Sequence, residues 1–228
     1  MSEICDSWKE FIVELQERIL PLYQSHEQHF DWSGIHGRMH ICRALIFAEA
    51  MGRAYLDKAE NVDFFAIRRA VAFHDAGRQG NGPDLWEMQS RQLCWDYVGK
   101  FYSGEEEGYA EYIGQLIIKG GENDLAYGVV HDSDVLEIMR PCCGHGGINA
   151  FRQGALRFAG KRDPLASRFD DPEDMRQQLI NDAWNFIVAT EKIKQNLNGS
   201  KNYLADLLEF IKSDTVKYPI LSGMVGES

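Results

Sequence analysis

The residues best suited to chemistry in this chain are an adjacent histidine and aspartate, His74 and Asp75. The pair follows an apolar run that includes Val71 and Phe73, and it precedes a glycine-rich loop at residues 76–82. One imidazole nitrogen and one carboxylate oxygen from neighbouring residues are ligands that suit divalent ions such as Mn, Fe or Zn. Because two ligands do not make a site, the others must come from elsewhere in the chain.

Two further residues extend the pair along the chain, His40 upstream and Asp134 within Ser133-Asp134-Val135-Leu136. The order of a histidine, a His-Asp pair and a later aspartate resembles the HD superfamily of phosphohydrolases. The resemblance covers about residues 31–140. It implies that His40, His74, Asp75 and Asp134 hold one divalent metal ion, which is Mn, Fe, Mg or Zn. It also implies hydrolysis of a phosphate ester, either a phosphomonoester, a nucleotide or a phosphodiester.

Two basic residues near these positions are predicted to bind the substrate phosphate. Arg78 follows the His-Asp pair and offers a planar fork to phosphate, although a surface salt bridge is an equal alternative. Lys119 stands where many HD proteins carry another histidine, so the resemblance favours one metal ion over two. A lysine at this position binds phosphate as a point charge.

Three residues are catalytic candidates, namely His36, Glu87 and His131. His36 lies four residues before His40, so both imidazoles share one helix face. His131 lies three residues before Asp134 and can protonate a leaving oxygen, or else be a buried, hydrogen-bonded histidine. Glu87 can act as a general base, although Asp84 and Glu87 also have the spacing of a capping box.

A second family resembles part of the same stretch. The arrangement His36-Gly37-x-x-His40-x-x-Arg43, with a glutamate and a later histidine, is similar to the phosphodiesterase domains of the Legionella SidE effectors. Those all-helical domains act on phosphoribosyl-linked ubiquitin with two histidines and a glutamate. The resemblance implies metal-free chemistry at His36 or His40, Glu87 and His131, on phosphoribosyl-linked or ADP-ribosyl-linked ubiquitin.

The third hypothesis is that the protein has no catalytic activity. An HD-like helical domain can serve as a ligand-binding module, and exposed Trp86 and Trp95 would suit a protein partner. Against this reading, several ionisable groups gathered near one another are costly to keep without a function.

Composition limits the partners of this 228-residue chain. Its net charge of −11 and pI of about 5.1 disfavour nucleic-acid duplexes and anionic membranes, so the expected partner is the phosphate-ester substrate, either a nucleotide or a phosphoribosylated protein. The N-terminus lacks a signal-peptide pattern, which predicts the cytoplasm, or a secreted effector under the second resemblance.

The five cysteines indicate reduced thiols. Cys142-Cys143-Gly144-His145 is predicted to be a turn, with a soft-metal site as the alternative. The oligomeric state does not follow from these residues.

The hydrophobic pattern predicts an all-α protein, a compact helical bundle of the HD-domain type with additional C-terminal helices. We expect one domain over residues 1–228, with a core at about 31–140 and a helical extension at about 148–213. The first helix is expected to be interrupted at Pro21, which leaves His26 and His29 in a loop. The other helices are expected at about 35–55, 62–75, 84–102, 109–118, 123–139, 148–158, 171–197 and 201–212, with an acidic loop at 104–108.

Overall fold

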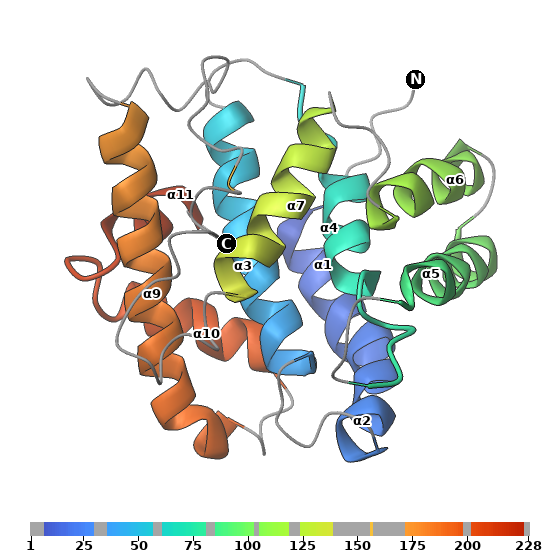
Figure 1. The fold of residues 1–228 in the computed structure, drawn as a ribbon, viewed down its shortest axis with the longest axis horizontal. Helices are drawn as coiled ribbons and strands as arrows, with labels where there is room; N and C mark the ends of the chain where they lie inside the picture. The colour runs from blue at the N-terminus through green and yellow to red at the C-terminus, as the bar shows by residue number, and fades with distance from the viewer. Residues whose placement is uncertain are drawn as a thin grey trace. The chain divides into compact units, whose positions relative to one another are not determined.

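The computed structural model describes residues 7–29, 36–56, 61–80, 85–102, 105–118, 124–138, 156, 172–197 and 202–225. All regular structure within these ranges is helical, which confirms the all-α prediction (Figure 1). The HD-type arrangement stays a prediction. None of the described helices is long and apolar enough to cross a bilayer. The elements are α1 (Trp8–Glu14), the π-helix η1 (Leu15–Ile19), α2 (Leu20–His29), α3 (Arg38–Leu56), α4 (Phe64–Phe73), α5 (Glu87–Phe101), α6 (Glu105–Ile117), α7 (Leu125–Ile138), α9 (Pro172–Leu197), α10 (Tyr203–Lys212) and α11 (Pro219–Val225).

The chain divides into two units by its internal contacts. The first unit comprises residues up to Ile41 together with Asp63–Val130, and the second comprises Cys42–Val62 together with His131–Ser228. Both α3 and α7 begin in the first unit and end in the second. The single-domain prediction stays a prediction.

In the first unit, α1, η1 and α2 form one uninterrupted helical run through Pro21, which corrects the expected break. Proline lacks the N–H that continues an α-helix, but it is tolerated in the first turn of a helix. Here the π-turn of η1 comes directly before α2, so Pro21 occupies the second position of the new helix. As a result, His26 and His29 lie in α2 rather than in a loop.

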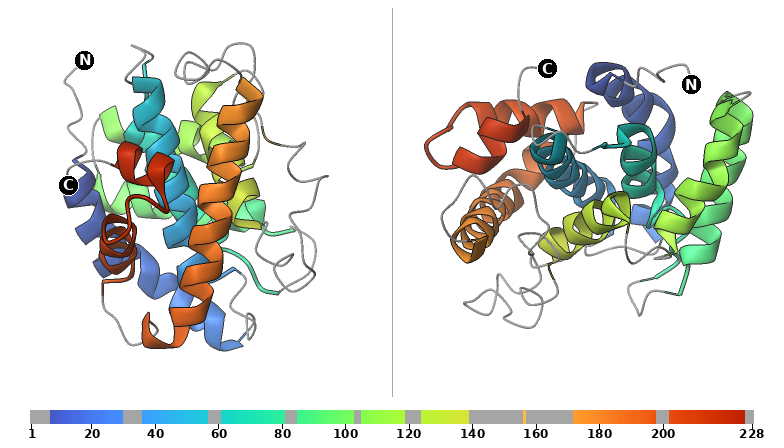
Figure 2. Two further views of the ribbon diagram at one scale, coloured as in Figure 1. Left: turned by 90° about the vertical axis from the view of Figure 1, so that its left-hand side faces the viewer. Right: turned by 90° about the horizontal axis from the view of Figure 1, so that it is seen from above.

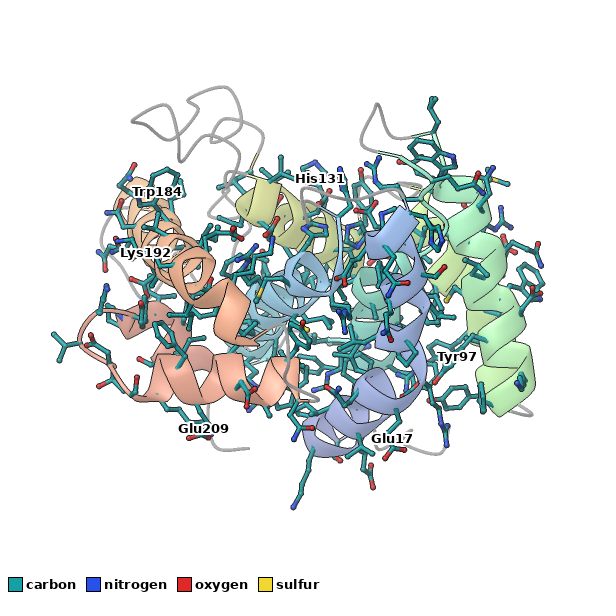
Figure 3. All side chains as sticks on the ribbon, turned by 90° about the horizontal axis from the view of Figure 1, so that it is seen from below. Glu17, Tyr97, His131, Trp184, Lys192 and Glu209 are labelled. Atoms are coloured by element: carbon teal, nitrogen blue, oxygen red, sulfur yellow. The ribbon has the colours of Figure 1, made fainter. Side chains whose placement is uncertain are left out.

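A buried polar network fixes the junction of α1 and η1. The carboxylate of Glu14 accepts hydrogen bonds from the Tyr97 hydroxyl at 2.8 Å and from Arg69 at 2.5 Å. Arg69 also donates to the Tyr102 hydroxyl at 2.6 Å, and its guanidinium lies 3.8 Å from the centre of the Phe65 ring. Tyr97 projects from α5 in Figure 3. The network therefore joins the N-terminal helical run to α4 and α5.

Helices α4, α5 and α6 pack against one another, with α5 and α6 side by side in Figure 1. Helix α4 is buried from Phe65 to Phe73, and the Asp63 carboxylate caps its start by accepting the Ala66 N–H. The predicted acidic loop at 104–108 is wrong, because α6 already begins at Glu105. Acidic residues are favoured in the first turn of a helix by the helix dipole, and the sequence has three consecutive glutamates at 105–107.

In the second unit, α9, α10 and α11 contact one another (Figure 2). The helix predicted at about 171–197 is confirmed, since α9 begins at Pro172 and ends at Leu197. Helix α11 was not predicted. Its start is held by Asp182 of α9, whose carboxylate accepts the backbone N–H groups of Ile220 at 2.7 Å and Leu221 at 3.2 Å. These two hydrogen bonds join residues almost forty positions apart in the sequence, so no local sequence pattern predicts them.

Candidate metal centre

The His-Asp pair lies in a tight turn directly after α4. The helix ends at Phe73, and residues 74–77 turn, with the Ala76 N–H donating to the Phe73 carbonyl at 2.9 Å. The Gly77 N–H donates to the Ser90 hydroxyl of α5 at 3.0 Å. A Cβ at Gly77 would lie 2.5 Å from the Ser90 backbone nitrogen, so only glycine allows this close approach. The turn is therefore fixed between the end of α4 and the first turns of α5.

His36 and His40 are positioned by the start of α3. Glu27 of α2 accepts the Arg38 backbone N–H at 2.6 Å and the Arg38 side chain at 2.9 Å. Gly37 packs so closely on Glu27 that a Cβ would lie 2.4 Å from its carboxylate. His36 lies just before the helix and His40 in its first turn, with ring centres 6.1 Å apart. The two rings lie close together, but His36 precedes α3, so the prediction that both belong to one helix face is wrong for His36.

The structure brings His40, His74 and Asp75 together within the first unit. The Nε2 atoms of the two histidines are 2.9 Å apart, and Asp75 Oδ2 lies 3.5 Å from that of His40 and 3.7 Å from that of His74. The His74 Nδ1–H donates to the Val71 carbonyl at 2.7 Å, which leaves the Nε2 lone pair directed away from the backbone. A backbone hydrogen bond of this kind fixes the tautomer that metal-ligating histidines use.

The donor set fits a divalent metal ion. A point equidistant from three atoms separated by 2.9, 3.5 and 3.7 Å lies about 2.0 Å from each of them, which matches the distances from zinc to histidine nitrogen and carboxylate oxygen. Two imidazoles and a carboxylate also suit Mn and Fe. These three residues would hold the ion.

Asp75 is buried, with 3% of its surface exposed, yet its charge is compensated on both oxygens. Oδ2 accepts a hydrogen bond from His36 Nδ1 at 2.9 Å, and Oδ1 accepts one from Arg78 Nε at 3.2 Å. Burial raises the pKa of Asp75, but electrostatic attraction to His74, the hydrogen bond of His36 and attraction to His40 and Arg78 outweigh it and hold the pKa well below its usual value. Asp75 is therefore a carboxylate rather than a carboxylic acid at neutral pH.

Arg78, which was predicted to bind phosphate, is buried in the same turn. Besides its bond to Asp75, its Nη1 donates to the Gly80 carbonyl at 3.3 Å, and its guanidinium lies 5.4 Å from the centre of the Trp86 ring. The backbone carbonyl of Arg78 accepts a hydrogen bond from His26 Nδ1 at 2.5 Å. Sequence reasoning missed His26 because it placed this histidine in a loop.

The remaining first-unit candidate, Glu87, is the first residue of α5 and is half-buried. Trp86 is the N-cap residue of α5 and makes no side-chain capping bond, so the helix begins three residues later than predicted. Asp84 lies outside the described residues. Lys119 lies outside the described residues, as do Cys142, Cys143 and His145.

His131 and Asp134 belong to the second unit, on α7, where Figure 3 labels His131. His131 Nδ1 lies 2.8 Å from Asp132 Oδ1, and Asp132 is buried. Sequence reasoning assigned Asp132 no role, although an adjacent carboxylate orients an imidazole. Asp134 is half-buried.

Arg43, part of the resemblance to the SidE domains, is also in the second unit. Its buried guanidinium donates to Glu137 at 2.6 Å and pairs with Glu191 at 2.9 Å. Arg43 Nη1 also lies 3.2 Å from the Thr190 hydroxyl. These contacts assign Arg43 to the packing of the second unit.

No protein-family model, curated protein or solved structure was found to match this chain.

Proposed function

We propose that this chain is a metal-dependent hydrolase of phosphate esters. The observation that carries the proposal is the convergence of His40 Nε2, His74 Nε2 and Asp75 Oδ2 around one point in the first unit. Asp134 is proposed as a further ligand from the order of ligands in the sequence. When bound, a divalent ion would make water a better nucleophile and neutralise charge on the phosphoryl group.

The chain's own residues then divide the remaining tasks. His40, His74 and Asp75 would bind the metal ion and fix its position. His36 is anchored through Nδ1 to Asp75, so its Nε2 is oriented to take or give a proton. Glu87 and His131 are proposed as further proton-transfer groups, and Lys119 as a phosphate-binding residue. The substrate class is a phosphodiester or a nucleotide, and the proposed location is the cytoplasm.

The test combines metal analysis with hydrolysis of a chromogenic phosphodiester. Gently purified protein is expected to contain near-stoichiometric divalent metal and to lose activity with a chelator, and Mn²⁺ restores it. A His74→Ala variant is expected to lose both metal and activity. His29→Ala is the matched control, because His29 is exposed on α2 and its Nδ1 bonds to the Ser25 carbonyl of its own helix.

A metal-free phosphodiesterase is the second candidate, and one contact favours it. The pairing of His36 Nδ1 with a buried carboxylate is the arrangement that orients a histidine for nucleophilic or basic chemistry. On this proposal, His36, Glu87 and His131 cleave a phosphoribosyl-linked or ADP-ribosyl-linked protein. Hydrolysis that is unaffected by chelator and lost in His36→Ala would favour it over the metal centre. Absence of hydrolysis under all conditions would favour a binding module.

A further inference from the structure

We infer that Arg78 is a positioning residue for Asp75 and that it is held in that role by Trp86 and His26. The inference rests on the proposed metal centre and replaces the phosphate-binding role that the sequence predicts for Arg78. The two carboxylate oxygens of Asp75 have different neighbours. Oδ1 bonds to Arg78 Nε, whereas Oδ2 faces the Nε2 atoms of His40 and His74.

An aspartate carboxylate rotates about its Cβ–Cγ bond, and this torsion has broad minima. A guanidinium bonded to Oδ1 restricts the rotation, so Oδ2 is retained toward the histidines. Groups that bond to the far atom of a ligand in this way orient it for the metal, and their loss typically lowers metal affinity by about 10–100-fold. Arg78 has the right bond on the right oxygen for this task.

The rest of Arg78 is fastened to protein. Its Nη1 donates to the Gly80 carbonyl, and the guanidinium carbon lies over the Trp86 ring. Its backbone is fixed as well, since the N–H donates to the Asp75 carbonyl at 3.1 Å and the carbonyl accepts from His26. The side chain is 6% exposed. Binding a phosphate through its planar fork would require Arg78 to give up these bonds.

The two roles predict opposite results for Arg78→Gln, measured on the full-length chain. If Arg78 positions Asp75, the Kd for Mn²⁺ measured by calorimetry on metal-stripped protein rises by about 10–100-fold. The Kd for inorganic phosphate, measured at saturating Mn²⁺, stays within about twofold. A phosphate-binding Arg78 would give the reverse pattern, with an unchanged Kd for Mn²⁺ and weakened phosphate binding, and would overturn the inference.

Three further measurements separate positioning from a general loss of structure. Arg91→Gln is the matched control, since Arg91 of α5 also pairs with a carboxylate, Glu111, and lies over an indole, Trp95. It should leave the Kd for Mn²⁺ unchanged. In Co²⁺-loaded protein, Arg78→Gln should alter the visible absorption bands while the far-UV circular dichroism is unchanged. Arg78→Lys, which keeps the charge, should restore Mn²⁺ affinity in part.

The outcomes also distinguish this inference from the proposed function. Wild-type protein that binds no Mn²⁺ would overturn both. Wild-type protein that binds Mn²⁺ with the same Kd as Arg78→Gln would overturn the positioning role alone and leave the metal centre in place. If Arg78→Gln does not fold, the Kd of Arg78→Lys decides, and an affinity equal to that of the wild type overturns the inference.

Discussion

Two buried aspartates, Asp75 in the first unit and Asp182 in the second, illustrate how neighbours decide the function of a carboxylate. They are almost equally buried, with 3% and 4% of their surfaces exposed. Asp75 is bonded by the side chains of His36 and Arg78, whereas Asp182 accepts two backbone N–H groups at the start of α11. One carboxylate faces an imidazole and a guanidinium, and the other faces backbone amides.

The pKa values of the two groups move in opposite directions. Burial raises the pKa of both, and at Asp182 the hydrogen bonds from Leu221 and Ile220 do not offset this effect. At Asp75, the attraction of His74, the hydrogen bond of His36 and the attraction of His40 and Arg78 reverse it. Burial therefore does not mark a functional carboxylate. A carboxylate held ionised beside imidazole nitrogens is suited to bind a metal, and one that caps a helix is suited to structure.

The largest expected effect comes from Asp75→Asn. The amide keeps the shape of the side chain but removes the charge that would attract a metal, so Mn²⁺ binding and phosphodiester hydrolysis should fall to background. Calorimetry and a chromogenic assay measure the two quantities. Asp182→Asn is the matched control and should leave both unchanged. Equal Mn²⁺ binding by Asp75→Asn and wild type would refute the assignment of Asp75 as a ligand.

The next effect is structural and belongs to Asp182→Ala. The variant leaves the N–H groups of Ile220 and Leu221 without their acceptor, which should lower the free energy of unfolding by about 1–3 kcal/mol. Urea denaturation measures this loss, and hydrogen exchange should accelerate at both amides. Asn181→Ala changes an exposed neighbour on α9 and should have little effect. Unchanged exchange at residues 220 and 221 would show that Asp182 does not hold α11.

The contrast between the two aspartates also explains what the sequence predicts well. Apolar spacing located most helices, because burial of a periodic face is a local signal. In α10, the four residues Leu204, Leu207, Leu208 and Ile211 have helical apolar spacing and all are buried. Chain order and resemblance selected His40, His74 and Asp75, which the structure brings together, and their role as ligands stays a prediction.

The features that the sequence did not reveal depend on long-range contacts. Helix α11 has seven residues, and its capping residue Asp182 lies on another helix. His26 was assigned to a loop because Pro21 is a local break signal, and the π-turn that accommodates it has no pattern of its own. The bond from His36 to Asp75 was likewise missed, since only His40 was considered as a partner of His36.

A smaller effect is expected for Ser90→Ala, which sharpens the comparison by loosening the turn around Asp75 without touching the carboxylate. The Gly77 N–H loses its buried acceptor, and one such donor should cost about 1 kcal/mol of unfolding free energy. The Kd for Mn²⁺ should rise only a few-fold, because the bonds of His36 and Arg78 remain. Ser213→Ala, at an exposed helix end, is the control. A Kd as weak as that of Asp75→Asn would mean that the turn, not the carboxylate, limits binding.

The smallest expected effect is a difference in pH dependence between the two aspartates in metal-free protein. Because folding lowers the pKa of Asp75, its ionised form contributes stability above the unfolded pKa of about 3.9, and this contribution is lost as the pH falls below that value. Folding raises the pKa of Asp182, so its contribution is present below about pH 3.9 and is lost as the pH rises through its folded value.

Urea denaturation of wild type, Asp75→Asn and Asp182→Asn at pH 7 and pH 4 tests both signs. The stability advantage of wild type over Asp75→Asn should shrink at pH 4, while that over Asp182→Asn should grow. If both differences moved in the same direction, the neighbours of the two carboxylates would not control their ionisation, and the distinction between a metal-binding and a capping aspartate would fail.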